Sequence, residues 1–264
     1  MKFSRFLKPT TQWLEQQQTS ILSAAIIITV ANFGSSLSGL IRQRLLITKF
    51  FDTPQSQEAF EALLVAFQIP DILFQLIVLG ALSAAFIPVF TTIKKQYGKD
   101  TAFEMSSVVI SILLVVFFLA SSVVFVFAEP LTRIRTGDAF TPEQITIATN
   151  LTRMMLFAQG FFAISSFFSA MLQSFHRFII PSIAPILYNI GIVIGVFLLY
   201  GQLGVYSAGV GVIIGAFLHM IVQLPLVLKI GYRPTFSLRT TAPGVKKLFS
   251  LMPARVVTLG VGEV

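Results

Sequence analysis

Two apolar stretches decide the fold of this chain: ANFGSSLSGLIRQRLLITKFF at residues 31–51 and AFQIPDILFQLIVLGALSAAFIPVF at residues 66–90. Polar and ionisable side chains lie in or beside both, namely Arg42, Arg44, Glu61, Gln68 and Asp71. An isolated charge in the hydrocarbon of a bilayer is costly, so such residues usually face a water-filled cavity or a partner. We therefore expect this pair of helices to line a polar cavity inside a membrane transporter, with the rest of the chain as its walls.

The composition of the chain is that of a membrane protein. Of its 264 residues, 55% are hydrophobic and only 11% are charged, and the mean hydropathy is +0.84. A soluble domain carries about 25% charged residues. Because lipid covers most of its surface, a polytopic membrane protein needs far less charge. We expect an all-α fold, a polytopic membrane helix bundle.

The charge distribution and the residue inventory argue against several other classes. The formal net charge is +8, but the cations lie mainly in short connections between apolar segments, so we expect no nucleic-acid partner. The chain has no Cys and only two His, which leaves no thiol chemistry and no cluster of metal ligands. A Gly-rich phosphate loop, a Ser/His/Asp set and paired carboxylates are also absent from the sequence. We expect neither an enzyme nor a bound metal or cofactor.

Apolar segments long enough to cross about 30 Å of hydrocarbon recur along the chain. We predict six complete spans and the start of a seventh, at 21–41, 58–93, 105–128, 149–175, 179–200, 206–228 and from 245 onward. Pro70 and Pro88 break the second span, which must bend, tilt or project from the membrane. Thr141 and Pro142 predict the start of a short amphipathic helix on the outer surface, before the fourth span.

The spans divide the chain into four parts with an expected orientation. These are a cytoplasmic tail at 1–19, a transmembrane lobe of six helices at 20–230, a cytoplasmic linker at 231–247, and a truncated start of helix seven at 248–264. Twelve Lys and Arg residues lie in the tail and in the second, fourth and sixth connections, against five on the opposite side. The positive-inside rule therefore predicts a cytoplasmic N-terminus.

Arg42 is the first candidate for a cavity-lining residue. It follows a run of small residues and lies three positions after Gly39, on the same helix face. Small residues let helices approach closely or leave room for a cavity. A guanidinium that faces a cavity suits a phosphate, whereas Arg42 or Arg44 beyond the hydrocarbon is a snorkelling anchor. Both interpretations stand at this stage.

The second span carries further candidates. Glu61 either pairs with an arginine of the first span or marks the exposed start of a helix. Pro70 frees a backbone carbonyl one turn earlier and kinks the helix. Asp71, which follows it, then faces the cavity or a neighbouring helix, and Gln68 lies beside it in the same apolar context.

The fifth and sixth spans carry polar residues at helical spacing. Asn189 follows Pro185 by four residues, so the two share one helix face, which indicates a moving part or a cavity wall. His219 and Gln223 are also four apart, and we expect them to form hydrogen bonds with a neighbouring helix. The candidates for hinge or packing positions are Gly39, Pro70, Gly80 and Pro185.

These residues belong to runs that resemble a known family. The runs are SSLSGLIRQRLL at 35–46, the stretch at 66–90 quoted above, IPSIAPILYNIGIVIG at 180–195 and GVIIGAFLHMIVQLP at 211–225. Together they resemble the bacterial lipid II flippases of the MurJ/MviN family, within the multidrug/oligosaccharidyl-lipid/polysaccharide exporter superfamily. The resemblance extends from about residue 20 to residue 264, and the run at 66–90 is its most specific part.

The resemblance implies a function. Proteins of this family move the undecaprenyl-pyrophosphate-linked peptidoglycan precursor across the bacterial cytoplasmic membrane, by alternating access between two lobes around a cationic cavity. Arg42 matches the cavity arginine of the family's first helix, and Glu61 matches an acid near the start of the second. Membrane lipid and a lipid-linked pyrophosphate are thus the expected partners. The substrate-binding candidates are Arg42, Arg44, Glu61, Gln68, Asp71 and Asn189.

The sequence departs from the family pattern in charge and in extent. Basic residues are common in the family at the positions of Ser36, Gln68, Phe74 and Gln75, and an acid is common at that of Leu79. This cavity therefore has fewer cations than that of a typical member. The family has two lobes, so the resemblance implies an N-terminal lobe only, a fragment whose partner is a missing C-terminal lobe or a second copy.

Other functions remain open at the level of sequence. One is export of another polyprenyl-linked glycan or of a cationic drug. Acids in the cavity favour a drug and arginines favour a pyrophosphate, and this chain carries both. The other is a non-transporting membrane scaffold, whose polar groups would only join helices. A scaffold tolerates a neutral substitution of Arg42, whereas a transporter of anions does not.

Overall fold

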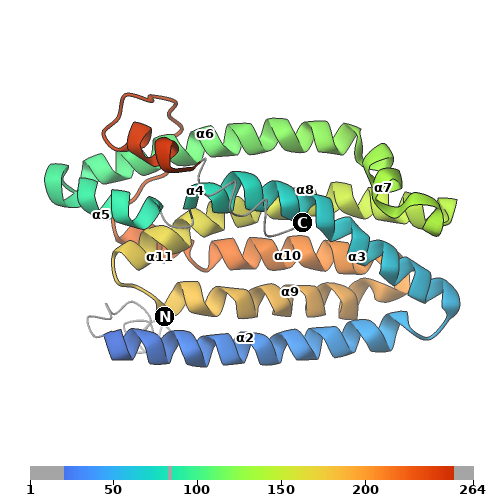
Figure 1. Ribbon diagram of the computed structural model, residues 1–264. Helices are drawn as coiled ribbons and strands as arrows, with labels where there is room; N and C mark the ends of the chain where they lie inside the picture. Colours follow the sequence, from blue (N-terminus) through green and yellow to red (C-terminus); the bar gives the residue numbers. More distant parts are fainter. Residues whose placement is uncertain (1–20, 83–84, 253–264) are drawn as a thin grey trace, which may run out of the picture.

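The computed structural model describes residues 21–82 and 85–252, and these form a bundle of long helices (Figure 1). Within these ranges the structure has helices, turns and extended connections and no strand. The helices are α2 (Ile21–Phe50), α3 (Pro54–Phe74), the π-helix η2 (Gln75–Leu79), α4 (Gly80–Leu82), α5 (Phe86–Tyr97), α6 (Lys99–Val126), α7 (Ala128–Thr136), the 3-10 helix η3 (Gly137–Ala139), α8 (Pro142–Ser174), α9 (Ile179–Leu203), α10 (Tyr206–Ile221) and α11 (Leu224–Lys229). A further helix begins at 245 and continues to 252.

Six segments of the described chain are long and apolar enough to cross a membrane. They are Leu22–Phe50, Pro54–Val78, Lys99–Val126, Pro142–Ser174, Ile179–Leu203 and Tyr206–Lys229. The prediction of an all-α bundle with six spans is therefore confirmed. The expected tail at 1–19 and most of the expected start of helix seven, at 253–264, lie outside the described residues.

The long helices α2, α6, α8, α9 and α10 run along one common direction, whereas α3 is inclined and α7 turns across one end of the bundle (Figure 1). α2 packs against α9, α9 against α10, and α10 against α8, while α3 and α6 also pack against α8. In its most apolar window α8 is 61% buried, but the corresponding window of α2 is only 6% buried. The centre of the bundle is therefore α8, and α2 is a peripheral helix with most of its apolar surface uncovered.

Glycines bring α9 and α10 into close contact. Gly191 and Gly195 of α9 face Gly211 and Gly215 of α10. A Cβ added to Gly191 would lie 2.3 Å from the Cα of Gly215, and one added to Gly195 would lie 2.3 Å from the Cα of Gly211. Each pair is spaced four residues apart, the small-xxx-small pattern that lets membrane helices approach closely. This packing fixes the face of α9 that carries Asn189.

The second span is irregular after its proline rather than at it. α3 continues through Pro70 and ends at Phe74, where a π-helix follows over Gln75–Leu79. Pro70 has no N–H to donate to the carbonyl one turn earlier, that of Ala66. The Thr152 hydroxyl of α8 donates to this Ala66 oxygen at 3.4 Å. The neighbouring helix thus satisfies the carbonyl that proline leaves without its helical donor.

Several helices run beyond the apolar spans predicted from the sequence, into polar sequence. α2 runs to Phe50 rather than Ile41, so Arg42 lies inside the helix. The predicted N-cap at Thr141 is confirmed, because its hydroxyl accepts a hydrogen bond from the Gln144 N–H at 3.2 Å. However, the helix that begins there is not a separate surface helix, because it continues without a break as α8. The short helix of this region is instead α7, which precedes the cap.

At the other end of the bundle, lysines cap helix C-termini. The Lys94 ammonium donates to the Ser174 carbonyl of α8 at 3.0 Å, and Lys99 donates to the Ile230 carbonyl after α11 at 3.1 Å. Cations are favourable at the carbonyl end of a helix. Partial burial, and then repulsion from Lys95, lowers the pKa of Lys94 below its ordinary value.

The segment that follows α11 packs along α6 as an extended connection. Tyr232 is buried, and its hydroxyl accepts a hydrogen bond from Ser107 at 3.2 Å. The Ser237 N–H donates to the hydroxyl of Ser111 at 3.0 Å. Tyr232 and Leu248 both belong to the apolar core formed with α5, α6 and α8. This connection is therefore held to the bundle by burial as well as by hydrogen bonds.

Candidate functional site

A polar cluster joins α2 to α9 in the half of α2 that lies nearer α3. The Arg42 guanidinium donates through Nη1 to Oδ1 of Asn189 at 3.0 Å. Asn189 Nδ2 donates to the Ser38 hydroxyl at 2.9 Å and to the Ser35 carbonyl at 3.2 Å, and Ser38 donates to the same carbonyl at 2.8 Å. We call Ser35, Ser38, Arg42 and Asn189 the α2–α9 cluster. Periodicity brings Ser35, Ser38 and Arg42 onto one face of α2.

The cluster leaves part of its arginine unsatisfied. Asn189 is buried, with only 6% of its surface exposed, and uses both amide functions inside the cluster. Arg42 Nε is also buried, and it has no hydrogen-bond partner among the residues that the structure describes. An unmet buried donor costs about 1–3 kcal/mol, more for a charged group. The neutral amide of Asn189 orients the guanidinium without neutralising it.

Arg42 lies in the wall of a cavity of about 260 Å³ between α2, α3, α9 and α10. A second cavity, of about 240 Å³, lies between α3, α8, α9 and α10 and has Asp71 in its wall. The walls share Phe67, Tyr188 and Val212, so the cavities adjoin. The structure thus places the candidate cation and the candidate acid in neighbouring cavities, with these apolar and aromatic side chains between them.

Asp71 is held by a neighbouring helix. Gln159 of α8, which is buried, donates a hydrogen bond through Nε2 to the Asp71 carboxylate. Gln159 was not among the sequence candidates, and neither was Thr152, which binds the Ala66 carbonyl. These two polar residues lie seven positions apart on α8 and therefore share a face. That spacing was a usable signal, because a polar stripe within an apolar span marks a contact with another polar group.

Three other candidates lie away from this cluster. Arg44 is exposed, and two positions along α2 it points to a different side from Arg42. Gln68 accepts a hydrogen bond from Arg135 of α7 at 2.6 Å. Glu61 is exposed, and its carboxylate accepts from Gln144 of α8 at 3.4 Å. The structure therefore brings together Arg42 and Asn189, and places Gln68 and Glu61 against other helices.

The hinge candidates differ in their surroundings. Gly39 faces the cluster, and a Cβ added there would lie 3.7 Å from Asn189 Nδ2, an ordinary contact. Pro70 is buried inside α3, and Pro185 lies inside α9 one turn before Asn189. Gly80 ends the π-helix and is buried. Proline and a π-turn are recognised causes of helix bending, so α3 combines two such features within one span.

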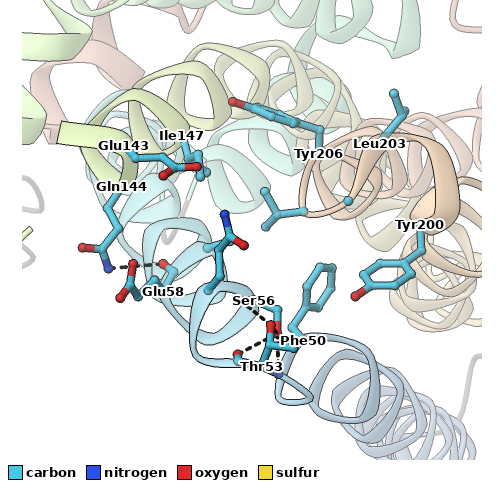
Figure 2. Close-up of a pocket in the computed structure, with 14 residues that line it drawn as sticks. Phe50, Thr53, Ser56, Glu58, Glu143, Gln144, Ile147, Tyr200, Leu203 and Tyr206 are labelled. Carbon is cyan, nitrogen blue, oxygen red and sulfur yellow. Dashed lines mark hydrogen bonds between the residues drawn. The ribbon is translucent and has the colours of Figure 1, made fainter. Parts of the chain in front are cut away.

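A third cavity, of about 330 Å³, lies where α2, α3, α8, α9 and α10 end or begin (Figure 2). Figure 2 shows Gln144 reaching toward Glu58, whose backbone carbonyl accepts its hydrogen bond at 3.4 Å. Thr53 and Ser56 form the reciprocal cap of α3 at the other side of the cavity. Most of the polar contacts around this cavity thus cap a helix or join two helices, so we interpret it as a structural junction.

A second polar cluster joins α8 to the end of α10. The Ser165 hydroxyl lies 2.6 Å from Nδ1 of His219, and Gln223 Nε2 donates to that hydroxyl at 2.7 Å and to the His219 carbonyl at 3.0 Å. Ser169 donates to Gln223 Oε1 at 2.8 Å. We call Ser165, Ser169, His219 and Gln223 the α8–α10 cluster. The predicted hydrogen bonds from His219 and Gln223 to a neighbouring helix are present in the structure.

The chain is similar to known proteins in sequence and in structure. The profile described as lipid II flippase MurJ matches residues 56–264. The lipid II flippase MurJ of Burkholderia cenocepacia is 31% identical, over 90% of this chain and 47% of its own length. A probable lipid II flippase MurJ from Borreliella burgdorferi is 28% identical, over 82% of this chain and 42% of its own length. The chain spans about half the length of the curated relatives it matches.

Two solved structures share the fold. A lipid II flippase MurJ in an inward closed conformation superposes with a TM-score of 0.69 at 23% identity, over 88% of this chain and 48% of that one. A transporter of the MOP superfamily from Pyrococcus furiosus superposes with a TM-score of 0.66 at 13% identity, over 93% of this chain and 54% of that one. At these identities the structures establish the shared arrangement of helices.

Proposed function

The chain belongs to the MurJ family of lipid II flippases, and from this premise we propose that it carries lipid II, the lipid-linked peptidoglycan precursor, across the cytoplasmic membrane by alternating access. The α2–α9 cluster is its proposed headgroup site. On this proposal the side chains bind and release the pyrophosphate, and no covalent chemistry is required of them.

The observation that carries the proposal is the incompletely satisfied Arg42. Its guanidinium lines a cavity, is oriented by the neutral Asn189 and keeps a buried Nε without a partner in the described part of the chain. A guanidinium presents five donors in a planar fork that matches phosphate oxygens. A pyrophosphate therefore supplies what the cluster lacks, namely negative charge and hydrogen-bond acceptors.

The alternative of a cationic drug as substrate is less well supported by the geometry. The acid available for a cation is Asp71, and its carboxylate already accepts a hydrogen bond from Gln159. Glu61 is exposed and contacts Gln144. The acids thus have neighbours that satisfy them, whereas Arg42 has a donor to spare. This asymmetry favours an anionic substrate.

We infer that transport needs a second body of helices facing α2. The side chains of Phe33, Val30 and Leu40 on α2 are 73%, 66% and 67% exposed. A carrier of this kind moves two bodies about a site between them. The second body is a C-terminal lobe or another copy of this chain, and its packing on α2 would cover this apolar face, which lies on the side of α2 opposite the α2–α9 cluster.

The proposed orientation has the N-terminus in the cytoplasm, as the cation bias requires. Tyr97 and Asp138 are both exposed. Tyr97 is the last residue of α5, just before α6 begins, and Asp138 lies in η3, just after α7. Because the chain has no Cys, Tyr97→Cys and Asp138→Cys each give a single thiol. A membrane-impermeant thiol reagent should label position 138 and not position 97 in intact cells. The reverse pattern would refute the orientation.

Binding of lipid II by the purified chain tests the site directly. Arg42→Gln removes the charge and keeps a polar side chain, and should weaken binding at least tenfold, which corresponds to about 1.4 kcal/mol at a charge-assisted hydrogen bond. Arg133→Gln is the matched control, because Arg133 is exposed on α7 and pairs with Glu129 at 2.9 Å. Native mass spectrometry of the two variants gives the comparison. Equal lipid II binding by both folded variants would refute the proposed site.

A further inference from the structure

An apolar groove runs along the outside of the bundle between α6 and α8. It has a volume of about 620 Å³ and extends along α6 from Leu114 to Val126. At 1.5 Å per residue this stretch of helix is about 18 Å long. Its volume lies within the range of about 300–1,000 Å³ that is common for ligand sites. The groove is separate from the cavities beside Arg42 and Asp71.

The lining of the groove is aromatic and open to the membrane. Phe118 is 70% exposed and Phe157 is 61% exposed, and both line it. Its polar atoms are few, and the Ser121 hydroxyl among them is buried with no partner in the described chain. Membrane helices pack on one another through small residues that permit close approach. The groove carries three small residues, Ser121, Ser122 and Gly160, among five Phe side chains, so a packed helix is the other occupant that the test below distinguishes.

One end of the groove carries a cation. Arg153 lies one turn before Phe157 on α8, and its Nε donates to the Phe125 carbonyl at 3.2 Å. Its guanidinium also lies 5.3 Å from the centre of the Phe125 ring. Phe125 and Phe157 meet edge to face at the same end of the groove, with ring centres 6.3 Å apart. α6 ends at Val126, one residue after Phe125, so this end of the groove lies at the end of α6.

The charge of Arg153 has no counterpart inside α8 at this level. It is the only Lys or Arg among the 33 residues of α8, and the one acid of that helix, Glu143, lies in its first turn. Its hydrogen-bond partners are neutral, the Phe125 carbonyl and the Asn150 amide oxygen at 3.5 Å. These use two of the five N–H groups of the guanidinium. The remaining donors are available to an anion at the end of the groove.

We propose that this groove binds an anionic phospholipid, with one acyl chain along α6 and the phosphate on Arg153. The acyl chain gives little preference of its own, because the bilayer is equally apolar. Selectivity for the lipid therefore comes from the headgroup charge. One basic residue near the membrane surface raises the affinity for an anionic lipid about fivefold. This lipid site is distinct from the proposed substrate site and does not depend on it.

Quenching by brominated lipids tests this site in the reconstituted chain. Ser122→Cys places a fluorophore on the groove, and Leu198→Cys places it on α9, where Leu198 is 65% exposed. Vesicles contain brominated phosphatidylglycerol or brominated phosphatidylcholine. We expect quenching at position 122 to show about a fivefold preference for phosphatidylglycerol, and position 198 to show a preference near one. Adding Arg153→Gln should bring position 122 to the value at position 198.

Each other result counts against the proposal. An equal preference for phosphatidylglycerol at positions 122 and 198 would show that the groove holds the same non-selective lipid as the rest of the surface. A preference at 122 that survives Arg153→Gln would remove the headgroup role of this arginine. Absence of quenching at 122 by both lipids would mean that protein covers the groove. The position-198 reporter in the Arg153→Gln chain verifies insertion, because its quenching should be unchanged.

Discussion

Two polar clusters cross helix interfaces in this bundle, and they differ in completeness. In the α8–α10 cluster, Gln223 is fully buried and its amide donates and accepts, with Ser165 and Ser169 as partners. In the α2–α9 cluster, Arg42 contributes a charge and a buried donor that stays without a partner in the described chain. A satisfied neutral cluster stabilises an interface. We propose that the charged cluster, which lacks an acceptor, is instead a ligand site.

The largest effect is expected on stability, from Gln223→Leu in the complete cluster. The change removes the donor to Ser165 and to the His219 carbonyl, and leaves the Ser169 hydroxyl without its acceptor. Several hydrogen bonds of this kind together should lower the free energy of unfolding by about 2 kcal/mol. Unfolding of the detergent-solubilised chain by denaturant measures it.

Gln202→Leu is the matched control for this change, because Gln202 is exposed near the end of α9. It should leave the free energy of unfolding within about 0.5 kcal/mol of the parent. If Gln223→Leu were as stable as this control, the α8–α10 cluster would not stabilise the contact between α8 and α10. The two clusters could then no longer be contrasted as one that stabilises the fold and one that binds a ligand.

The number of spans followed from the sequence, whereas several helix ends did not. Hydropathy reports how much apolar chain is available to cross the bilayer, and that was enough to count six spans. Backbone hydrogen bonding does not stop where hydrocarbon stops, so α2 continues from Ile41 to Phe50 and carries Arg42 within it. The position of charged residues indicates where a span leaves the membrane, but not where its helix ends. Capping residues such as Thr141 indicate where a helix begins.

The next effect is a loss of ligand binding of about tenfold, from Asn189→Asp. This substitution places a fixed carboxylate against the Arg42 guanidinium, which Asn189 now contacts at 3.0 Å. A carboxylate there neutralises the charge that an anionic ligand would use, and one opposite charge at this distance corresponds to about 1.4 kcal/mol or more. Titration with farnesyl pyrophosphate in detergent measures the affinity.

The control makes the corresponding amide-to-carboxylate change beside another arginine. Gln68→Glu places a carboxylate against Arg135 of α7, whose Nε donates to the Gln68 side-chain oxygen at 2.6 Å. It should leave the affinity for farnesyl pyrophosphate unchanged, because this pair lies away from the α2–α9 cluster. A similar loss in both variants would point to general electrostatics rather than to the α2–α9 cluster.

Residue type and spacing identified Arg42 and Asn189 as candidates, but not as partners. They lie 147 positions apart, and their contact depends on α9 packing beside α2, which periodicity within one helix does not determine. The sequence also suggested Glu61 as a partner for an arginine of the first span. In the structure Glu61 contacts Gln144, because α3 packs mainly on α8. Helix order in the bundle, which arises from long-range packing, was the missing information.

A smaller effect is expected from Ser38→Ala, about threefold in the affinity for farnesyl pyrophosphate. Ser38 accepts a hydrogen bond from Asn189 at 2.9 Å, so its loss loosens the amide that orients Arg42. Asn189 keeps the Ser35 carbonyl as an acceptor, which limits the effect to about 0.6 kcal/mol. Ser250→Ala is the control, because the Ser250 hydroxyl also donates to a carbonyl three residues earlier but lies exposed. An unchanged affinity in Ser38→Ala would mean that Asn189 is positioned by α9 alone.

An effect of about the same size, but on stability instead of binding, is expected from Ser169→Ala, which removes one hydrogen bond from the complete cluster. Ser169 donates to Gln223 Oε1 at 2.8 Å, while Gln223 Nε2 keeps Ser165 and the His219 carbonyl. The cluster therefore persists, and a single hydrogen bond between membrane helices contributes about 0.6 kcal/mol. Denaturant unfolding should show a loss of that size, and the affinity for farnesyl pyrophosphate should not change. Ser169→Ala and Ser38→Ala thus each remove one hydroxyl, one from each cluster. The first should lower stability and leave binding unchanged, and the second should weaken binding. If Ser169→Ala weakened ligand binding as much as Ser38→Ala, the two clusters would be coupled, and the division between structural and ligand-binding polarity would fail.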